Sequence, residues 1–181
     1  MPATRSRLFS WLDTWRPDEL QGTLVDIFIA DAAGAPMQRL QECRLLPGRG
    51  IAGDRYAVDS GHWRSVDACE VTLVSAEAIA AAGRRGAVSF ADGEHRRNLV
   101  VSGIPLQAYR DSELVIGESL LRFHRLRPPC AYLDRLLRPG AGRALGRAGG
   151  IGLTVVQGGT VRVGDRVELR PRRDPGHQSR A

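Results

Sequence analysis

The chain has 181 residues, 43% of them hydrophobic, and carries a formal charge of +6 at pH 7. This length allows one domain with a buried core, and no apolar run of about 18 residues is present that would span a membrane. Residues 1–15 lack the apolar segment of a secretory signal, and the three cysteines form no Cys-x-x-Cys pair, so we expect a protein of the reducing cytoplasm.

All 26 basic residues are arginine. The absence of lysine excludes catalysis through a lysine Schiff base. Guanidinium groups are planar donors that suit phosphate and carboxylate, although all-arginine usage is also a compositional habit of some genomes. The tail from Arg170 holds four arginines and one aspartate, so +3 of the +6 lies there. The small charge of the remaining chain gives little indication of nucleic-acid binding.

The N-terminal segment, residues 1–22, is predicted to be an amphipathic arm. Leu8, Trp11, Leu12 and Trp15 recur at helical spacing and form one apolar stripe. We expect this arm to pack on the domain, and docking on a membrane surface or on a partner protein is the alternative.

From Thr23 the pattern becomes that of short strands separated by turns. Apolar segments predict strands at 23–29, 71–75, 98–103, 113–117, 119–126 and 153–159. Ser75 is a suitable N-cap for a short helix that Gly83 would end, and one or two further helices are expected within 131–148.

The C-terminal part of the pattern completes the predicted fold class. Valines on both sides of Gly164 and Asp165 predict a tight β-hairpin within 161–169. Many short strands, 21 glycines and few helices predict a mainly β protein, built as a β-barrel or rolled sheet with helices at its ends. No alternation of strands and helices is apparent, which argues against a Rossmann-type nucleotide-binding fold. From Arg170 the composition is that of a disordered tail.

The segment RPPCAYL places Cys130 directly after two prolines and before an apolar-periodic run that predicts a helix. At the positive end of a helix and close to Arg127, a thiol has a lowered pKa, and its thiolate can bind a soft metal or carry sulfur. A buried core cysteine is the alternative that the residues alone leave open. Cys43 and Cys69 lack such a lead-in and are interpreted as core residues.

A cluster of polar residues before one predicted strand is a candidate for anion binding. Arg96, Arg97 and Asn98 offer two guanidinium groups and an amide, which can hold an anion or the edge of a heterocycle. Charges beside a strand are usually solvated, which is the other interpretation. His95 has no metal-ligand partner at a useful spacing, and we expect it at the surface.

The glycine-rich segment LPGRGIAGDRYA, residues 46–57, lets a ligand approach the backbone closely, as phosphate loops do. It does not match the P-loop pattern, which also requires lysine. Within it, Asp54 and Arg55 form a structural pair, or Arg55 faces an anionic ligand.

Five segments, taken in order, resemble the MOSC domain, which is the C-terminal domain of molybdenum cofactor sulfurases. They are LPGRGIAGDRYA (46–57), VTLVSAEAI (71–79), RRNLVVSGIPLQ (96–107), LVIGESLLRFHRLRPPCAYLDRL (114–136) and GGTVRVGDRVEL (158–169). The resemblance is closest to the short stand-alone bacterial MOSC proteins. The expected domain plan is an arm over 1–22, a MOSC-like domain over 23–169 and a basic tail over 170–181.

The resemblance implies a β-barrel-rich fold that binds the pterin molybdenum cofactor (molybdopterin). Cys130 matches the cysteine that ligates molybdenum in the family, which implies that it is the metal ligand and the catalytic residue. Arg96 and Asn98 match an Arg-x-Asn element that contacts the phosphate region of the pterin. Arg55 aligns with an arginine that follows a glycine-aspartate turn, and Ser75 aligns with a hydroxyl near the cofactor.

The resemblance also implies a reductase of N-hydroxylated small molecules. The second barrel portion and the ferredoxin domain of longer relatives have no counterpart in this sequence, so a separate reductase is expected to donate electrons. Lysines that help to hold the cofactor in relatives are missing here, so arginine replaces them or the cofactor is held more weakly. A carrier of sulfur or of the cofactor, using a Cys130 persulfide, is the alternative function, and a nucleic-acid partner is not expected.

Overall fold

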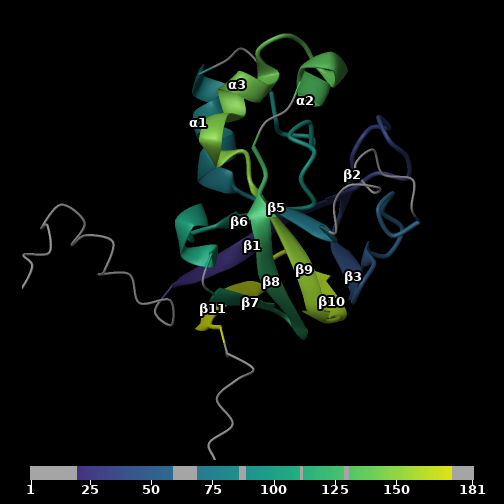
Figure 1. The fold of residues 1–181 in the computed structure, drawn as a ribbon, viewed down its shortest axis with the longest axis vertical. Coiled ribbons are helices and arrows are strands. Elements are labelled where there is room, and N and C mark those ends of the chain that lie inside the picture. The colour runs from purple at the N-terminus through teal and green to yellow at the C-terminus, as the bar shows by residue number, and fades with distance from the viewer. Residues whose placement is uncertain (1–19, 59–68, 86–88, 111, 129–130, 173–181) are drawn as a thin grey trace, which may run out of the picture.

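A computed structural model of the chain describes residues 20–58, 69–85, 89–110, 112–128 and 131–172 (Figure 1). The residues that precede or follow these ranges include most of the predicted N-terminal arm, the end of the predicted tail, and Cys130. The predictions made for those residues lie outside the described part of the chain.

Seven strands close into a barrel, which confirms the predicted mainly β fold class. Around the barrel, the hydrogen-bonded order is β11 (Arg166–Pro171), β7 (Ser112–Ile116), β8 (Ser119–Leu126), β9 (Ile151–Gln157), β5 (Val71–Ser75), β6 (Leu99–Ser102) and β1 (Gln21–Ile29). The ring is closed by an antiparallel pairing between β1 and β11, in which Gln21 is opposite Glu168. A closed ring leaves no long unpaired strand edge.

The remaining strands extend this barrel at one side. The short strand β2 (Gln38–Leu40) pairs with the end of β1. A separate small sheet consists of β10 (Gly159–Arg162), β3 (Glu42–Leu46) and β4 (Gly50–Ile51).

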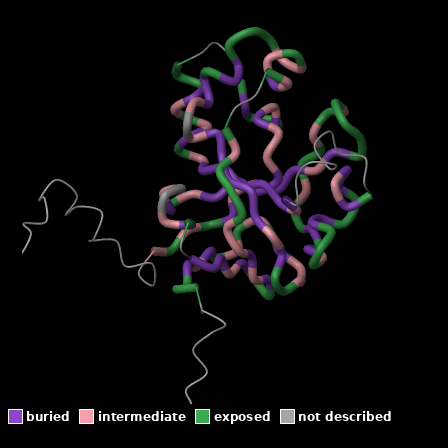
Figure 2. Tube along the Cα trace, viewed as in Figure 1, coloured by how far each residue is buried: buried purple, intermediate pink, exposed green. Residues whose placement is uncertain are grey.

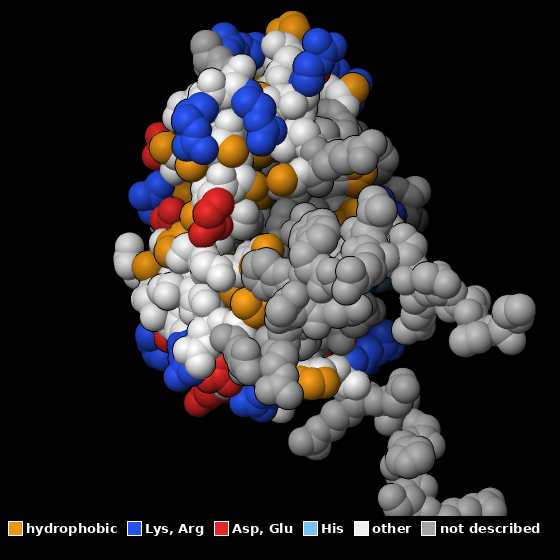
Figure 3. Space-filling model, turned by 90° about the vertical axis from the view of Figure 1, so that its left-hand side faces the viewer, with side chains coloured by type: hydrophobic (Ala, Val, Ile, Leu, Met, Phe, Trp, Pro, Cys, Tyr) orange, Lys and Arg blue, Asp and Glu red, His pale blue; other side chains and the backbone are white. Residues whose placement is uncertain are grey.

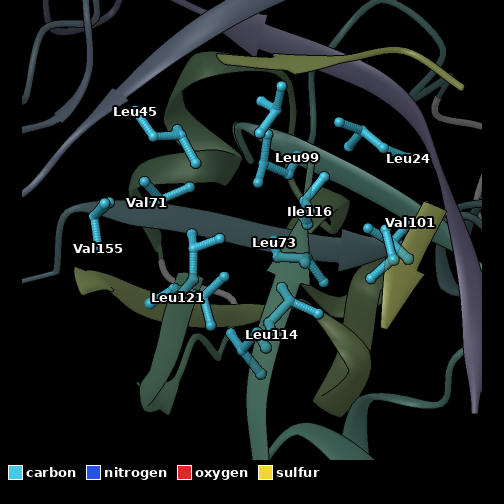
Figure 4. Close-up of a cluster of buried hydrophobic side chains, with 14 of the residues drawn as sticks. Leu24, Leu45, Val71, Leu73, Leu99, Val101, Leu114, Ile116, Leu121 and Val155 are labelled. Carbon is cyan, nitrogen blue, oxygen red and sulfur yellow. The ribbon is translucent and has the colours of Figure 1, made fainter. Parts of the chain in front are cut away.

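The barrel interior is filled by aliphatic side chains that the strands direct inward (Figure 4). Leu24, Leu73, Leu99, Leu114 and Leu121 are all at most 1% exposed. Each fully buried leucine stabilises the fold by about 1.5–3 kcal/mol. The buried residues are concentrated at the centre of the molecule, where the barrel strands lie, as Figure 2 shows.

Three α-helices within the described residues lie together at one end of the barrel (Figure 1). They are α1 (Ala76–Arg85), α2 (Ala131–Leu136) and α3 (Ala141–Leu145). The described ranges also contain two single-turn 3₁₀ helices, η3 (Leu106–Tyr109) and η4 (Gly146–Ala148). The α-helices share an apolar cluster of their own, which contains Ala82, Phe90, Leu133 and Leu145. None of the described helices is long and apolar enough to cross a bilayer.

The predicted strands and helices are confirmed in kind, and the end of α1 differs from the prediction. The backbone N–H of Ala78 donates to Oγ of Ser75 at 3.1 Å, so Ser75 is the N-cap that the sequence predicts. Gly83 does not end the helix, which continues to Arg85. Gly83 is not among the glycines with a positive φ. A glycine permits a left-handed helix end without requiring one.

The predicted hairpin around Gly164 is wrong, although its turn is present. The N–H of Asp165 donates to the carbonyl of Arg162 at 3.0 Å, and Gly164 has a φ of 94°. However, β10 pairs with β3, whereas β11 pairs with β7 and β1. The turn therefore passes the chain from the small sheet to the barrel.

The structure also contains one strand-helix-strand unit that the sequence pattern did not indicate. Strands β5 and β6 are parallel neighbours, with Leu73 opposite Leu99, and α1 connects them. The other strand pairs are antiparallel within the described residues, so this unit does not make a Rossmann fold. Cys43 on β3 and Cys69 before β5 are buried, as predicted, and burial raises the pKa of the Cys43 thiol to about 12.

Candidate functional site

The carboxylate of Asp54 is the centre of a buried hydrogen-bond network. It accepts hydrogen bonds from the backbone N–H groups of Ala30 and Tyr56, from Nη1 of Arg55 (each 3.1 Å) and from Nδ2 of Asn98 (3.3 Å). These partners offset the cost of removing the carboxylate from water. The network joins the end of β1, the turn after β4 and the residue before β6 at one place.

Asn98 is buried and uses its whole side chain inside the protein. Its amide N–H groups donate to Asp54 and to the carbonyl of Phe28 (3.1 Å). Its Oδ1 accepts from the backbone N–H of Thr72 (3.1 Å) and from the Thr72 hydroxyl (2.8 Å). An asparagine side chain has two donors and two acceptor positions. A direct contact between Asn98 and a ligand would therefore need one of these bonds to be exchanged.

Arg55 is buried against its neighbours in the sequence. Its Nη1 lies 3.1 Å from Oδ1 of Asp54, so the predicted structural pair is confirmed. Its guanidinium carbon lies 4.9 Å from the centre of the Tyr56 ring, a cation–π distance. Contact between Arg55 and an anionic ligand stays a prediction.

Arg96 has a strained backbone. Its φ of 61° is the one positive value among the described residues other than glycine. A non-glycine residue in the left-handed region costs about 1–2 kcal/mol and is often found at functional sites. The turn is held by the N–H of Arg96, which donates to the carbonyl of Gly93 at 2.8 Å. The side chain bends back, and Nη1 donates to the carbonyl of Ala35.

The positive charges of Arg96 and Arg55 act on each other. Partial burial lowers the pKa of Arg96, and the positive charge of Arg55 lowers it further. Tyr132 of α2 and Asp54 act in the opposite direction. Asp54 thus pairs with Arg55 and also acts electrostatically on Arg96, at the end of the barrel that the helices cover.

His95 is buried, so the prediction that it lies at the surface is wrong. Its Nδ1 accepts the backbone N–H of Arg97 at 3.0 Å, and its ring meets the ring of Phe28 edge to face, with centroids 5.4 Å apart. Burial, followed by the charges of Arg97 and Arg96, lowers its pKa to about 3. His95 is therefore neutral at physiological pH and fixes the turn that carries Arg96.

Arg97 connects this turn to the segment that leads to Cys130. Its Nε donates to the carbonyl of Gly149 at 2.6 Å, and its Nη2 donates to the carbonyl of Arg127 at 3.3 Å. The N–H of Arg127 donates in turn to the carbonyl of Gly150 at 2.8 Å. The first residue of the RPPC segment is thereby held beside the Arg96 turn, and Cys130 itself lies outside the described residues.

Ser75 takes no described part in the network around Asp54. It follows Thr72 by three residues along β5, which is about 10 Å at the rise of a strand. Its Oγ caps α1. The structure thus brings Arg55, Arg96 and Asn98 together and places Ser75 apart from them. A contact between Ser75 and the cofactor stays a prediction.

The roles of three contributors to the site were not predicted from the sequence. Thr72 lies inside an apolar strand, and nothing in the local sequence pattern indicates that it bonds to Asn98. The sequence predicts that Arg97, like Arg96, donates hydrogen bonds to an anion, whereas its side chain donates to backbone carbonyls. Asp54 was seen only as a partner of Arg55, although the glycine-aspartate turn is a local signal for such a side chain. Within the described residues, no group of three metal-ligating side chains is present.

Comparison with known proteins agrees with this architecture. The YuaD protein from Bacillus subtilis is 18% identical, with a TM-score of 0.71, and the alignment covers 85% of this chain and 98% of YuaD. YiiM from Geobacillus stearothermophilus is 16% identical, with a TM-score of 0.61, over 83% of this chain and 76% of YiiM. YiiM from Escherichia coli is 18% identical, with a TM-score of 0.61, over 84% and 71%.

At these identities the solved structures show a shared fold. No curated protein matches the sequence. The family model of the MOSC domain matches residues 61–168, which is more than half of the chain. The match includes the turn of Arg96 and Asn98 and the segment around Cys130. This chain therefore belongs to the MOSC domain family, whose members are associated with the molybdenum cofactor.

Proposed function

We propose that this protein holds the molybdenum cofactor beside Arg55 and Arg96 and uses it to reduce N-hydroxylated small molecules. In such a reduction an N–OH group becomes N–H and water leaves, and two electrons and two protons are consumed. The electrons come from a separate donor protein. The observation that carries the proposal is that the positive charges of Arg55 and Arg96 interact beside the carboxylate of Asp54.

The residues present fit the phosphate end of the cofactor. Arg55 and Arg96 bring two guanidinium groups to a partly buried place, where a phosphate gains more from such donors than it does in open water. Arg96 is half-buried, with Nη1 donating to the carbonyl of Ala35. The strained backbone of Arg96 supports a binding role, because such strain is often kept at functional sites.

Asn98 and His95 act as positioning residues in this proposal. Asn98 fixes the start of β6 through Thr72 and Phe28, and His95 fixes the turn through the N–H of Arg97. Both therefore hold the Arg96 side chain in place. A direct bond from Asn98 to the cofactor belongs to the proposal only as an exchange for one of its present hydrogen bonds.

Cys130 is proposed as the molybdenum ligand and catalytic residue. The support is its match to the family's cysteine, the suitability of a soft thiolate for molybdenum, and the bond from Arg97 that holds Arg127 near Arg96. When bound, the cofactor supplies the two-electron redox chemistry. The chain supplies orientation, charge and exclusion of water.

The test is the reduction of an aromatic amidoxime by protein purified from a host that makes the cofactor. Reduced methyl viologen serves as electron donor, and the amidine product is measured by mass spectrometry. We expect turnover by the wild type, none by Cys130→Ala, and unchanged turnover by the control Arg162→Gln on the far strand β10. Protein that carries molybdenum but forms no amidine would contradict the reductase proposal. A mass increase of about 32 Da on Cys130 without molybdenum would favour the sulfur carrier instead.

A further inference from the structure

The three α-helices carry a face of exposed arginines, which we call the arginine face. Its members are Arg84 and Arg85 of α1, Arg135 of α2, Arg138 after it and Arg143 of α3, all of them exposed. In Figure 3 the blue arginine side chains gather at this upper, helical end with few acidic side chains among them. At the lower end, blue and red side chains alternate.

Three exposed arginines of the barrel end are paired with carboxylates. Nε of Arg162 lies 2.9 Å from Oε2 of Glu42, Nε of Arg166 lies 3.3 Å from Oε1 of Glu168, and Nη2 of Arg170 lies 3.5 Å from Oε2 of Glu168. Surface pairs of this kind add little stability, but they neutralise the local field. These three arginines therefore attract an anionic partner less than unpaired arginines would.

The carboxylates at the helical end are committed to backbone N–H groups instead. Oδ1 of Asp134 accepts the N–H of Gly142 at 2.7 Å, and Oε1 of Glu77 accepts the N–H of Gly103 at 2.9 Å. Within the described part of the chain, Arg84, Arg138 and Arg143 take part in no ion pair. The arginine face thus keeps its positive charge.

The arginine face also borders the candidate site. Tyr132 of α2 lies close enough to Arg96 to affect it electrostatically, and the guanidinium carbon of Arg135 lies 5.7 Å from the centre of the Tyr132 ring. The large hydrophobic side chains that are exposed in the described residues are Val58, Leu126 and Val156, none of which lies on a helix. A charged surface without exposed apolar anchors suits a short-lived complex steered by charge.

We propose that the arginine face is the docking surface for an acidic electron-donor protein, an inference that rests on the proposed reductase function. An acidic partner is attracted by the unpaired guanidinium groups, and docking there places it next to the cofactor end of the barrel. Transient electron-transfer complexes have small interfaces, and their rates of association depend on complementary charge. The arginine face supplies the positive side of such a complementary pair.

The experiment compares two triple variants of the full chain, each of which removes three positive charges. Arg84→Gln, Arg138→Gln and Arg143→Gln neutralise the arginine face. Arg162→Gln, Arg166→Gln and Arg170→Gln are the matched control at the barrel end. The probe is flavodoxin, a small acidic electron carrier. Binding is measured by calorimetry at low salt, and the rate of electron transfer from reduced flavodoxin to the cofactor-loaded protein is measured by stopped flow.

We expect the arginine-face variant to bind flavodoxin about tenfold more weakly and to accept electrons about tenfold more slowly, and the control to change by less than about twofold. The difference should shrink when salt rises towards about 0.5 M, because screening removes the attraction. Equal affinities in the two variants would overturn the docking surface. So would a loss of binding to a DNA duplex as large as the loss for flavodoxin, since the face would then be a general polyanion site.

Methyl viologen separates this inference from the proposed function. It is a small cation that needs no docking surface, so both variants should turn over as fast as the wild type with it. If methyl viologen supports turnover while flavodoxin binds both variants alike, only the docking surface is contradicted. If methyl viologen gives no product with loaded wild type, the reductase function is contradicted, and the binding measurement still decides whether acidic proteins dock here.

Discussion

Arg96 combines features that a purely structural residue does not need. It occupies the left-handed region of backbone conformation, it is half-buried, and the positive charge of Arg55 acts on it. Each feature costs stability. Together they support the proposal that the position is kept for its guanidinium donors, which would hold an anion with Arg55.

Replacing Arg96 separates backbone strain from binding. We expect Arg96→Gly to be more stable than Arg96→Ala by about 1 kcal/mol, because only glycine adopts the left-handed region without strain. Both variants lack the guanidinium, so both should lose the cofactor. Urea unfolding measures the first effect, and released-pterin fluorescence measures the second. An alanine variant as stable as the glycine variant would show that the turn relaxes and that strain is not stored there.

Asp54 is the residue whose loss should disturb the site most. Asp54→Ala leaves Arg55 buried without its carboxylate and removes the acceptor of three other donors, so we expect a loss of about 3–5 kcal/mol in the free energy of unfolding. Asp54→Asn keeps one acceptor oxygen and should lose about 1–3 kcal/mol. Both are measured by urea unfolding. A change below about 0.5 kcal/mol for Asp54→Asn would mean that the network does not hold the site together.

His95 should make stability depend on pH. Its pKa is about 3 in the folded protein and 6.5 when unperturbed. Below pH 6.5 the unfolded chain binds a proton that the folded protein does not, so stability falls as the pH drops from 6.5 towards 3. His95→Asn keeps an acceptor for the N–H of Arg97 and removes this titration. Between pH 7 and pH 5.5, wild type should lose about 1 kcal/mol more stability than His95→Asn. Parallel pH profiles for the two proteins would show that the histidine is not buried as a neutral ring.

At the scale of elements, strands were predicted from local sequence pattern, whereas the pairing of strands that lie far apart in sequence was not. The strands β1, β5, β7 and β8 were predicted because their alternation and β-branched residues are properties of a few consecutive residues. The partners of β10 and β11 were not, because a turn such as Gly164-Asp165 looks the same whether its strands pair or part. The parallel pairing of β5 and β6 was not predicted either, because neither strand's local sequence pattern shows which strand lies beside it.

Two glycines test how the turns between elements are fixed. Gly50 and Gly164 have nearly equal φ values, 95° and 94°. A Cβ at Gly164 meets nothing within 4 Å, whereas a Cβ at Gly50 would lie 2.2 Å from the carbonyl oxygen of Glu70. Gly164→Ala should cost about 1–2 kcal/mol from backbone strain alone. Gly50→Ala should cost a further 1–3 kcal/mol or so from overlap. Equal midpoints of urea unfolding for the two variants would contradict this difference.

At the scale of the whole molecule, closing the barrel builds the site. The end of β1, the turn after β4 and the start of β6 are far apart in sequence, and the ring of strands brings them together at Asp54. Arg55, Arg96 and Asn98 were predicted as site residues from their donor groups and from the resemblance that the five motifs carry, and the structure brings them together. The roles of Thr72, His95 and Arg97 were not found, because their partners are set by strands that no local pattern connects.

The most direct measurement of the central claim is the molybdenum and pterin content of protein from a cofactor-producing host. Wild type is compared with Arg96→Gln and Cys130→Ala, and with Arg162→Gln as the control. We predict near-stoichiometric molybdenum and pterin in wild type and control. Arg96→Gln should retain at most about one tenth of the wild-type molybdenum and pterin, because a charge-assisted hydrogen bond is lost. Cys130→Ala should lose the metal. Wild type without molybdenum, or Arg96→Gln with unchanged content, would contradict the account.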